Sequence, residues 1–304
     1  MRVLVTGGAG FVGRHLAAHL LEKGCSVWSA DRRDGPPGTA TVATDLSEPA
    51  GAERAVGESR PDLVFHLAAR TPASAPDATP AEWLGGDPVL THHLLEAVRV
   101  HAPATRVLVM SSSAVYGHVP PAGLPILETA PLRPVTLYGV AKAAVELTAL
   151  RFHTAHGLHV VRARPFNLVG PGEPPGMLTS TLAAQVARIA RGEAPPVVRM
   201  RHRATSRDYT DVRDAVQAYW TLLEKGTPGE VYNVCSGEAT AIGELARRLI
   251  RRAGVEVRIE ETADGPAAGD ILTQAGDRSK ITSATGWAPS IPLDRSIADL
   301  LTSF

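Results

Sequence analysis

The start of the chain constrains the fold more than any other segment. Residues 2–6 read RVLVT, and the glycines Gly7, Gly10 and Gly13 then lead into apolar side chains at helical spacing over residues 11–21. A strand that enters a helix through a turn without side chains presents unpaired backbone N–H groups and the positive end of the helix dipole. The pattern predicts a turn that holds a pyrophosphate at the first strand of a parallel α/β sheet.

Each glycine has its own expected part in this turn. Gly7 makes the turn, Gly10 lets the phosphates approach the backbone, and Gly13 lets the helix pack closely on the strand. Three glycines alone are weak evidence, because structural turns also use glycine. The cofactor-contacting residues expected in this segment are Gly7, Gly10, Phe11, Val12 and Gly13.

A carboxylate at the end of the second predicted strand strengthens the dinucleotide interpretation. Asp31 lies about 20 residues beyond the turn, where a carboxylate accepts hydrogen bonds from an adenosine ribose. It would also repel a 2′-phosphate, which favours NAD. Arg32 and Arg33 follow directly and are able to hold that phosphate, so NADP stays an alternative cofactor.

Composition limits the partners of the chain. Its 304 residues include 31 basic and 31 acidic side chains, so no global field attracts nucleic acid or an anionic membrane. No apolar run reaches the roughly 18 residues of a membrane span, and no signal-type segment precedes RVLVTG. Cys25 and Cys235 lie in apolar runs and are expected to be buried thiols. We expect a cytoplasmic protein that binds no metal.

Strand and helix patterns alternate through the first half of the chain. This alternation predicts a Rossmann-type α/β fold, a doubly wound parallel sheet with helices on both faces. Runs typical of strands occur at residues 2–6, 25–30, 62–68, 106–112 and 158–164, and helical patterns at 92–100 and 137–157.

A Pro- and Gly-rich break at residues 170–176 (GPGEPPG) changes this pattern. We expect a dinucleotide-binding domain over residues 1–166, to which a segment near 211–237 returns. Residues 167–304 are expected to form mainly a smaller, interleaved α/β lobe that binds the substrate. Helices in this second half are predicted near 178–192, 211–225 and 240–253.

A tyrosine and a lysine on one predicted helix are the first candidates for chemistry. Tyr138 and Lys142 lie four residues apart and so share a face. An ammonium group near a phenol stabilises the phenolate, which suits the tyrosine for proton transfer. Hydroxyl groups also gather at a strand end in MSSSAVYG, where Ser112 is placed to hydrogen-bond a substrate oxygen, with Ser111 and Ser113 as capping or structural alternatives.

Several motifs together resemble the extended short-chain dehydrogenase/reductase family, whose members are mostly nucleotide-sugar epimerases, dehydratases and ketoreductases. They are TGGAGFVG, DL at 45–46, HLAA at 66–69, SSSAVYG and YGVAK, and the resemblance covers nearly the whole chain. It implies that Ser112, Tyr138 and Lys142 are catalytic, with Tyr138 moving the proton and Lys142 also holding the nicotinamide ribose. Further cofactor contacts implied by the resemblance are Asp45 and Leu46 near the adenine, then Leu67, Ala68, Ala69 and Pro165.

The second half looks most like the GDP-4-keto-6-deoxy-mannose reductases, through RPFNLVGPGEPPG, RDYTDVRD and TGWAPSIPLDRSI. This resemblance implies that Asn167 contacts a nucleotide-sugar substrate and that Arg207 binds its diphosphate, which a guanidinium fork suits. Without the resemblance, Arg207 would be expected to form a surface ion pair with Asp208 or Asp211. Ser113 and Asp270 complete the implied substrate-binding set.

The sequence departs from this family pattern at three places. Ala114 stands where the reductases carry a glutamate, and neither Ser113 nor Ala114 supplies the acid of a dehydratase, which disfavours 4,6-dehydration. The SSSA stretch resembles 4-epimerases instead. A second diphosphate-binding arginine is missing shortly before Asp270, and Asp87 and Leu90 occupy the asparagine and glycine positions of an Asn-x-x-Gly motif.

Three functions fit a fold of this kind. The leading interpretation is a ketoreductase acting on a nucleotide-activated 4-keto sugar, and the alternative is an NAD-dependent 4-epimerase that uses the same three residues. A non-catalytic cofactor-sensing protein of the same fold is disfavoured, because a sensor needs neither Tyr138 nor Lys142. A homodimer through the helices near 92–100 and 137–156 is a further candidate, although an apolar helix face is equally a core face.

Overall fold

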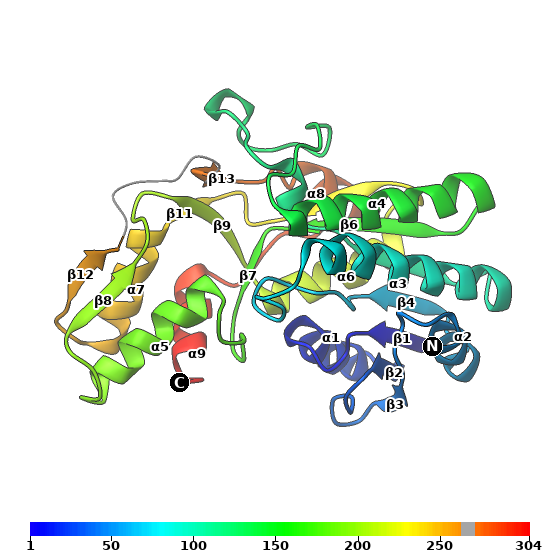
Figure 1. Cartoon of the computed structure of the whole chain (residues 1–304), viewed down its shortest axis with the longest axis horizontal. Helices are drawn as coiled ribbons and strands as arrows, with labels where there is room; N and C mark the ends of the chain where they lie inside the picture. Colours follow the sequence, from blue (N-terminus) through cyan, green and yellow to red (C-terminus); the bar gives the residue numbers. More distant parts are fainter. Residues whose placement is uncertain (263–270) are drawn as a thin grey trace.

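The computed structural model describes residues 1–262 and 271–304. Its larger lobe is built on a parallel sheet in the order β10-β6-β5-β4-β1-β2-β3 (Figure 1). From β1 the chain continues to β2 and β3 at one edge of the sheet, and it then crosses to β4 on the other side of β1. Open α/β sheets bind ligands where the strand order reverses in this way, so we expect ligands at the carboxyl ends of β1 and β4. The strands are β1 (Arg2–Thr6), β2 (Ser26–Asp31), β3 (Ala40–Ala43), β4 (Leu63–His66), β5 (Arg106–Met110), β6 (Val160–Pro165) and β10 (Val231–Val234).

Helices cover both faces of this sheet. Successive side chains of a strand point to opposite faces, so Val3 and Val5 enter the core beneath α1 and α6, while Leu4 enters the core beneath α2, α3 and α4. The helices are α1 (Phe11–Glu22), α2 (Pro49–Ser59), α3 (Pro80–His101), α4 (Leu137–His156), α6 (Val212–Lys225) and α8 (Ser279–Thr285), with the short 3₁₀ turns η1 (Ser113–Tyr116) and η2 (Pro121–Gly123).

A smaller lobe with its own core lies at the left of Figure 1. In it, β9 pairs with β7, β11 and β13, while β8 pairs with β12. Three helices pack around these strands. The elements are β7 (Asn167–Val169), α5 (Leu178–Ala190), β8 (Val197–Met200), β9 (Ser206–Asp211), β11 (Ala239–Ala241), α7 (Ile242–Ala253), β12 (Arg258–Glu261), β13 (Thr273–Gln274) and α9 (Leu293–Leu301).

The predicted fold class, a doubly wound parallel α/β sheet, is confirmed. Strand β10 joins the large sheet beside β6, and α6 packs against α1. The domain division at residue 166 stays a prediction. No helix in the described part of the chain is long and apolar enough to cross a membrane, and Cys25 and Cys235 are both free and buried.

Candidate functional site

The glycine turn between β1 and α1 has almost no room for side chains. Gly7 has a φ of +70°, and a Cβ atom there would lie 2.9 Å from the backbone nitrogen of Ala68, just after β4. A Cβ atom on Gly13 would lie 2.3 Å from the carbonyl oxygen of Gly7. Gly8, which the sequence did not single out, is equally confined, because its Cβ atom would lie 2.2 Å from Oγ of Ser29 on β2. The turn is thus packed directly against its neighbouring strands.

The beginning of α1 suits an anionic group. The N-cap residue, Gly10, supplies no side-chain cap, so the first backbone N–H groups of the helix are not satisfied by a side chain. Nothing lies nearer than 3.1 Å to a Cβ atom built on Gly10. An uncapped helix start beside a backbone without side chains is the arrangement that a pyrophosphate fits. These residues therefore fit the dinucleotide that the sequence predicts.

Asp31 ends β2 next to this turn. Its carboxylate accepts hydrogen bonds from the backbone N–H of Ala9 (3.3 Å) and of Arg33 (3.1 Å). The Arg33 Nε lies 3.6 Å from the same carboxylate, and the guanidinium is 71% exposed. Arg32 is exposed as well. Groups suited to a ribose and to a 2′-phosphate thus stand together at the end of this strand.

The residues expected near the adenine follow β3. Asp45 is exposed, and the backbone and side-chain hydrogen bonds from Ser47 lower the pKa of its carboxyl group. Leu46 is buried, and its carbonyl oxygen lies 3.2 Å from Nδ1 of His93 on α3. At the far side of the expected site, Pro165 is the last residue of β6.

The HLAA segment is held in place by a buried histidine. The Thr91 hydroxyl donates to the carbonyl oxygen of Asp87 (2.7 Å), so it accepts from Nε2 of His66 (3.0 Å). The other ring nitrogen, Nδ1, therefore accepts from the hydroxyl of Thr6 (2.8 Å), which itself accepts from the N–H of Ala68 (3.1 Å). Burial and the nearby Lys142 ammonium lower the pKa of His66 to about 3, so this ring is neutral. It fixes Leu67, Ala68 and Ala69 at the end of β4.

The three serines after β5 have different surroundings. Ser112 caps η1, and its Oγ accepts from the N–H of Ala114 (3.1 Å), which leaves its own proton for another acceptor. Ser113 instead donates to the side chain of Gln274 on β13 (3.3 Å). The Ser111 hydroxyl faces the backbone of Lys142 (3.5 Å). Ser112 is thus the serine best placed to donate to a substrate oxygen.

Tyr138 and Lys142 lie in the first two turns of α4. Thr136 starts this helix by accepting from the N–H of Gly139 (3.0 Å), and a Cβ atom on Gly139 would lie 2.7 Å from the carbonyl oxygen of Ala114 in η1. The glycine in YGVAK thus lets α4 approach the serine turn. The Lys142 Nζ lies 5.9 Å from the centre of the half-buried Tyr138 ring.

A carboxylate at a position that departs from the family pattern belongs to this site. Asp87 Oδ2 lies 3.3 Å from Nζ of Lys142, and both side chains are almost fully buried. Asp87 Oδ1 accepts from the backbone N–H of Arg70 (2.9 Å). The helical pattern around Asp87 is broken by Pro88 and two preceding glycines, so no periodicity indicated that Asp87 faces α4.

Two of the predicted substrate residues, Asn167 and Arg207, lie in the smaller lobe. The Asn167 amide donates to the carbonyl oxygen of Asp208 (3.1 Å). Arg207 lines a cavity of about 160 Å³ together with Leu178, Arg201, His202, Thr205 and Ile242. Arg201 thus brings a second arginine side chain to this cavity. Asp270 lies outside the described residues.

The carboxylates beside Arg207 have other partners. Asp208 accepts hydrogen bonds from Ser236, Gly237 and Gly276. Asp211 caps α6 and pairs with Arg213 at 2.8 Å. Both carboxylates thus stabilise local structure where β9 meets elements of the larger lobe.

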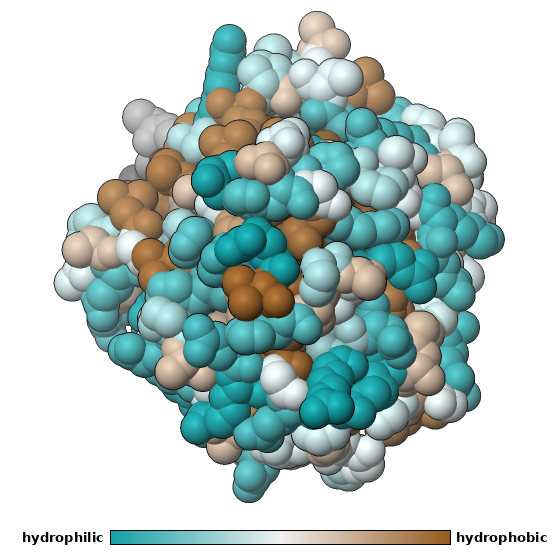
Figure 2. All heavy atoms as spheres, turned by 90° about the vertical axis from the view of Figure 1, so that its right-hand side faces the viewer, coloured by the Kyte–Doolittle hydropathy of each residue, from teal (hydrophilic) through white to brown (hydrophobic). Residues whose placement is uncertain are grey.

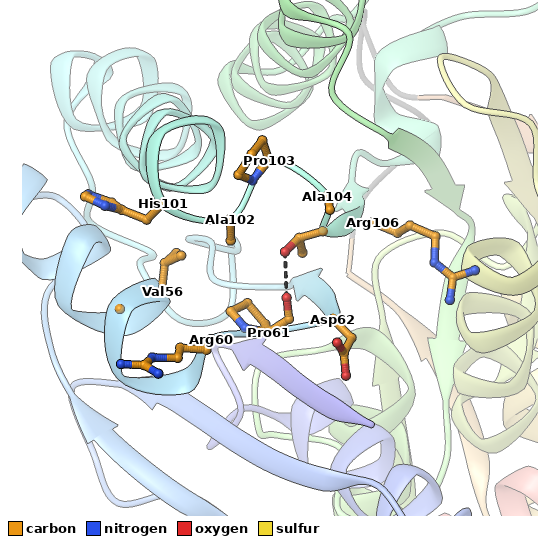
Figure 3. Close-up of a pocket in the computed structure, with 11 residues that line it drawn as sticks. Val56, Arg60, Pro61, Asp62, His101, Ala102, Pro103, Ala104 and Arg106 are labelled. Carbon is orange, nitrogen blue, oxygen red and sulfur yellow. Dashed lines mark hydrogen bonds between the residues drawn. The ribbon is translucent and has the colours of Figure 1, made fainter.

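A hollow of about 670 Å³ lies away from all of these residues. It is lined by the ends of α2 and α3 and the starts of β4 and β5, including Arg60, Asp62 and Arg106 (Figure 3). On its lining, the Thr105 hydroxyl donates to the carbonyl oxygen of Pro61 (2.6 Å). Figure 2 views the molecule from this side, where apolar residues are scattered among polar ones. The hollow is at the amino edge of the sheet, opposite to the predicted site.

Comparisons with known proteins agree with this geometry. The chain is 33% identical to GDP-6-deoxy-D-mannose reductase of Pseudomonas aeruginosa, with 100% of this chain and 97% of the relative covered. The structure of RMD from P. aeruginosa complexed with NADPH superposes with a TM-score of 0.88 at 33% identity, covering 100% of this chain and 98% of the other. The Thermus thermophilus UDP-glucose 4-epimerase complex with NAD also gives 0.88, at 29% identity and the same coverage.

The family comparison extends over most of the larger lobe and into the second. The match begins in β1 and includes the glycine turn, the serine turn, and Tyr138 and Lys142 on α4. It ends at Cys235, just after β10 returns to the large sheet. Over residues 3–235 the chain matches the model of the NAD dependent epimerase/dehydratase family, and it belongs to that family.

Proposed function

We propose that the protein reduces a 4-keto group on a GDP-linked 6-deoxy sugar. The observation that carries this proposal is the arrangement at the carboxyl edge of the large sheet. There, Ser112 keeps a free hydroxyl proton, and the half-buried Tyr138 lies beside the ammonium of Lys142. The GDP-6-deoxy-D-mannose reductase of P. aeruginosa aligns over the whole chain and supports the choice of substrate class.

The residues divide the work of a carbonyl reduction. The hydride for this reduction would come from a nicotinamide cofactor held by the glycine turn. Ser112 donates a hydrogen bond to the carbonyl oxygen, where negative charge develops, and Tyr138 gives that oxygen its proton. The ammonium of Lys142 stabilises the phenolate that Tyr138 becomes. The product is the 4-hydroxy sugar.

Binding of the two ligands is assigned to the two lobes. The glycine turn from Gly7 to Gly13 would hold the pyrophosphate of the cofactor, with Asp31 and Arg33 at the adenosine ribose. Because both a carboxylate and a guanidinium stand there, we propose that NADPH and NADH are both accepted. Arg207 and Arg201 would hold the diphosphate of the sugar nucleotide.

The absence of an acid beside Ser112 argues against dehydration. Ala114 supplies no carboxyl group to protonate a leaving hydroxyl. The 4-epimerase remains the second candidate, because it would need the same three residues and is supported by the superposition on the T. thermophilus epimerase. The two reactions differ in whether reduced cofactor is consumed.

The test offers the purified protein NADPH or NADH with GDP-, dTDP- and UDP-linked 4-keto-6-deoxy sugars. We expect one reduced cofactor to be consumed for each GDP sugar reduced. The Tyr138→Phe variant should fold normally and lose at least about 100-fold in kcat. Tightly held NAD together with interconversion of C4 epimers, without added cofactor, would establish the epimerase instead.

We also propose a cytoplasmic homodimer. Apolar side chains stay exposed on α3 and α4, namely Leu84, Val89, Val100, Leu137, Val140 and Leu147. Helix faces of this kind are typical of a helix-mediated dimer. The free thiols Cys25 and Cys235 suit a reducing compartment. Light scattering on the protein as it elutes from a size-exclusion column should give a molar mass twice that of the chain.

A further inference from the structure

Lys142 is held by a carboxylate inside the protein. The Lys142 side chain is 5% exposed and that of Asp87 is 2% exposed, and 3.3 Å separates Nζ from Oδ2. The other carboxylate oxygen accepts from the Arg70 N–H, so Asp87 is fixed both by α3 and by the segment after β4. A buried pair of this kind keeps its members together, because separation leaves an uncompensated charge out of water.

Within residues 1–262 and 271–304, the other groups around Tyr138 and Lys142 contribute no second anion. His66 on β4 is neutral. Tyr138 faces the Trp83 ring on α3, with the ring centres 5.9 Å apart. The buried Tyr219 on α6 interacts electrostatically with Tyr138, and burial, with this interaction, raises the pKa of Tyr219. Glu146, one turn beyond Lys142 on α4, pairs with Arg164 and Arg162. Asp87 is therefore the carboxylate that acts on Lys142.

We propose that Asp87 is a positioning residue that offsets the charge of Lys142 and so keeps Tyr138 in its protonated, proton-donating form. This inference rests on the proposed function. An unpaired ammonium beside a phenol favours the phenolate, and a carboxylate in contact with that ammonium cancels part of the effect. A carbonyl reduction begins with a phenol, whereas the oxidation of an alcohol begins with a phenolate. Asp87 thus favours reduction.

The aspartate at position 87, where the family pattern has asparagine, changes the charge next to Lys142. A neutral asparagine at position 87 would still accept from the Arg70 N–H, but it would leave the ammonium of Lys142 at full charge. The Asp87→Asn substitution changes little besides that charge. This variant therefore isolates the effect of the Asp87 charge on Lys142 and Tyr138.

The experiment is a spectrophotometric titration of the protein without cofactor or substrate. Phenolate absorbance is followed as pH rises, and the signal of Tyr138→Phe is subtracted to isolate Tyr138. The subtraction is favourable, because the other four tyrosines are buried and Tyr138 is not. We expect Asp87→Asn to lower the midpoint by about 0.5–1 pH unit. Glu96→Gln, the same change of charge at a half-buried position of α3 that pairs with Arg99, should leave it unchanged.

A double variant tests whether Asp87 acts through Lys142. In the Lys142→Met background, the shift caused by Asp87→Asn should shrink to less than half. A wild-type midpoint in Asp87→Asn, or an equal shift with and without Lys142, overturns the proposal. Because no substrate is present, the titration can succeed while the reductase assay fails. The two conclusions are therefore separable.

Thermal unfolding covers the case in which Asp87→Asn does not fold. In Lys142→Met, Asp87 is left buried without its cation and must take up a proton to stay buried. This variant should therefore lose stability relative to wild type as pH rises from about 4 to neutrality. Lys142→Met with the wild-type pH dependence would contradict the pairing.

Discussion

Replacing Gly13 by alanine tests whether the close packing of the glycine turn controls both stability and cofactor binding. The added Cβ atom would lie 2.3 Å from the Gly7 carbonyl oxygen and 2.6 Å from that of Gly8. Ordinary contacts begin at 3.4 Å, so the start of α1 must move by roughly 1 Å in a close-packed interior. Overpacking of this size costs about 1–3 kcal/mol.

A matched substitution is available on another helix. Gly57 lies on the exposed side of α2, where a Cβ atom would meet nothing within 4 Å. Gly57→Ala should therefore stabilise the protein by about 0.5–1 kcal/mol, the usual gain of alanine over glycine in a helix. The two variants differ only in whether the new methyl group has room.

Urea unfolding and cofactor titration measure the two consequences of Gly13→Ala. We expect its free energy of unfolding to fall by about 1–3 kcal/mol, while that of Gly57→Ala rises. Because the displaced backbone is the proposed pyrophosphate cradle, the Kd for NADPH should rise at least about tenfold, which corresponds to about 1.4 kcal/mol. If Gly13→Ala is as stable as Gly57→Ala and binds NADPH normally, the packing argument is wrong.

Two further predictions concern the smaller lobe. Arg207→Met should raise the Kd for GDP by about 10–100-fold through loss of a charge-assisted contact, with NADPH binding unchanged; calorimetry that finds equal GDP affinity would remove Arg207 from the site. Burial raises the pKa of Glu173 to about 7, so its contribution to stability is full below about pH 4.5 and is lost as pH rises through 7. Glu173→Gln should thus gain on the order of 2 kcal/mol over wild type between pH 5 and pH 8 in urea unfolding; the same difference at both pH values would contradict this.

The larger lobe was predicted well where local patterns and packing agree. The segment 2–6 and the helix starting at residue 137 were found at their observed positions. The strand β3 and the helix α2 were not, because α2 contains a proline and two glycines and has little helical signal of its own. It is stabilised by burying Ala52, Ala55 and Val56 against the sheet, which the sequence does not display.

The helix α3 shows a similar conflict. Only its second half, near 92–100, was predicted, because Gly85, Gly86 and Pro88 interrupt the pattern. A Cβ atom on Gly86 would lie 1.8 Å from a guanidinium nitrogen of Arg70, the end of a long side chain that could move aside. The helix α3 forms despite these breaks because its buried side chains pack against α2 and α4, contacts that the local pattern does not show.

The residues of the candidate site also divide into those that local motifs indicate and those that only contacts between helices reveal. Ser112, Tyr138 and Lys142 could be named from short-range spacing and from a resemblance carried by local motifs. Asp87 could not, because its partner lies on another helix, and the two meet only once β4 and β5 set α3 beside α4. The sequence did mark position 87 as unusual, but only the contact with Lys142 turns that departure into a statement about proton transfer. A buried charge at an atypical position is best interpreted through the charge it faces. Either charge is costly out of water when its partner is missing.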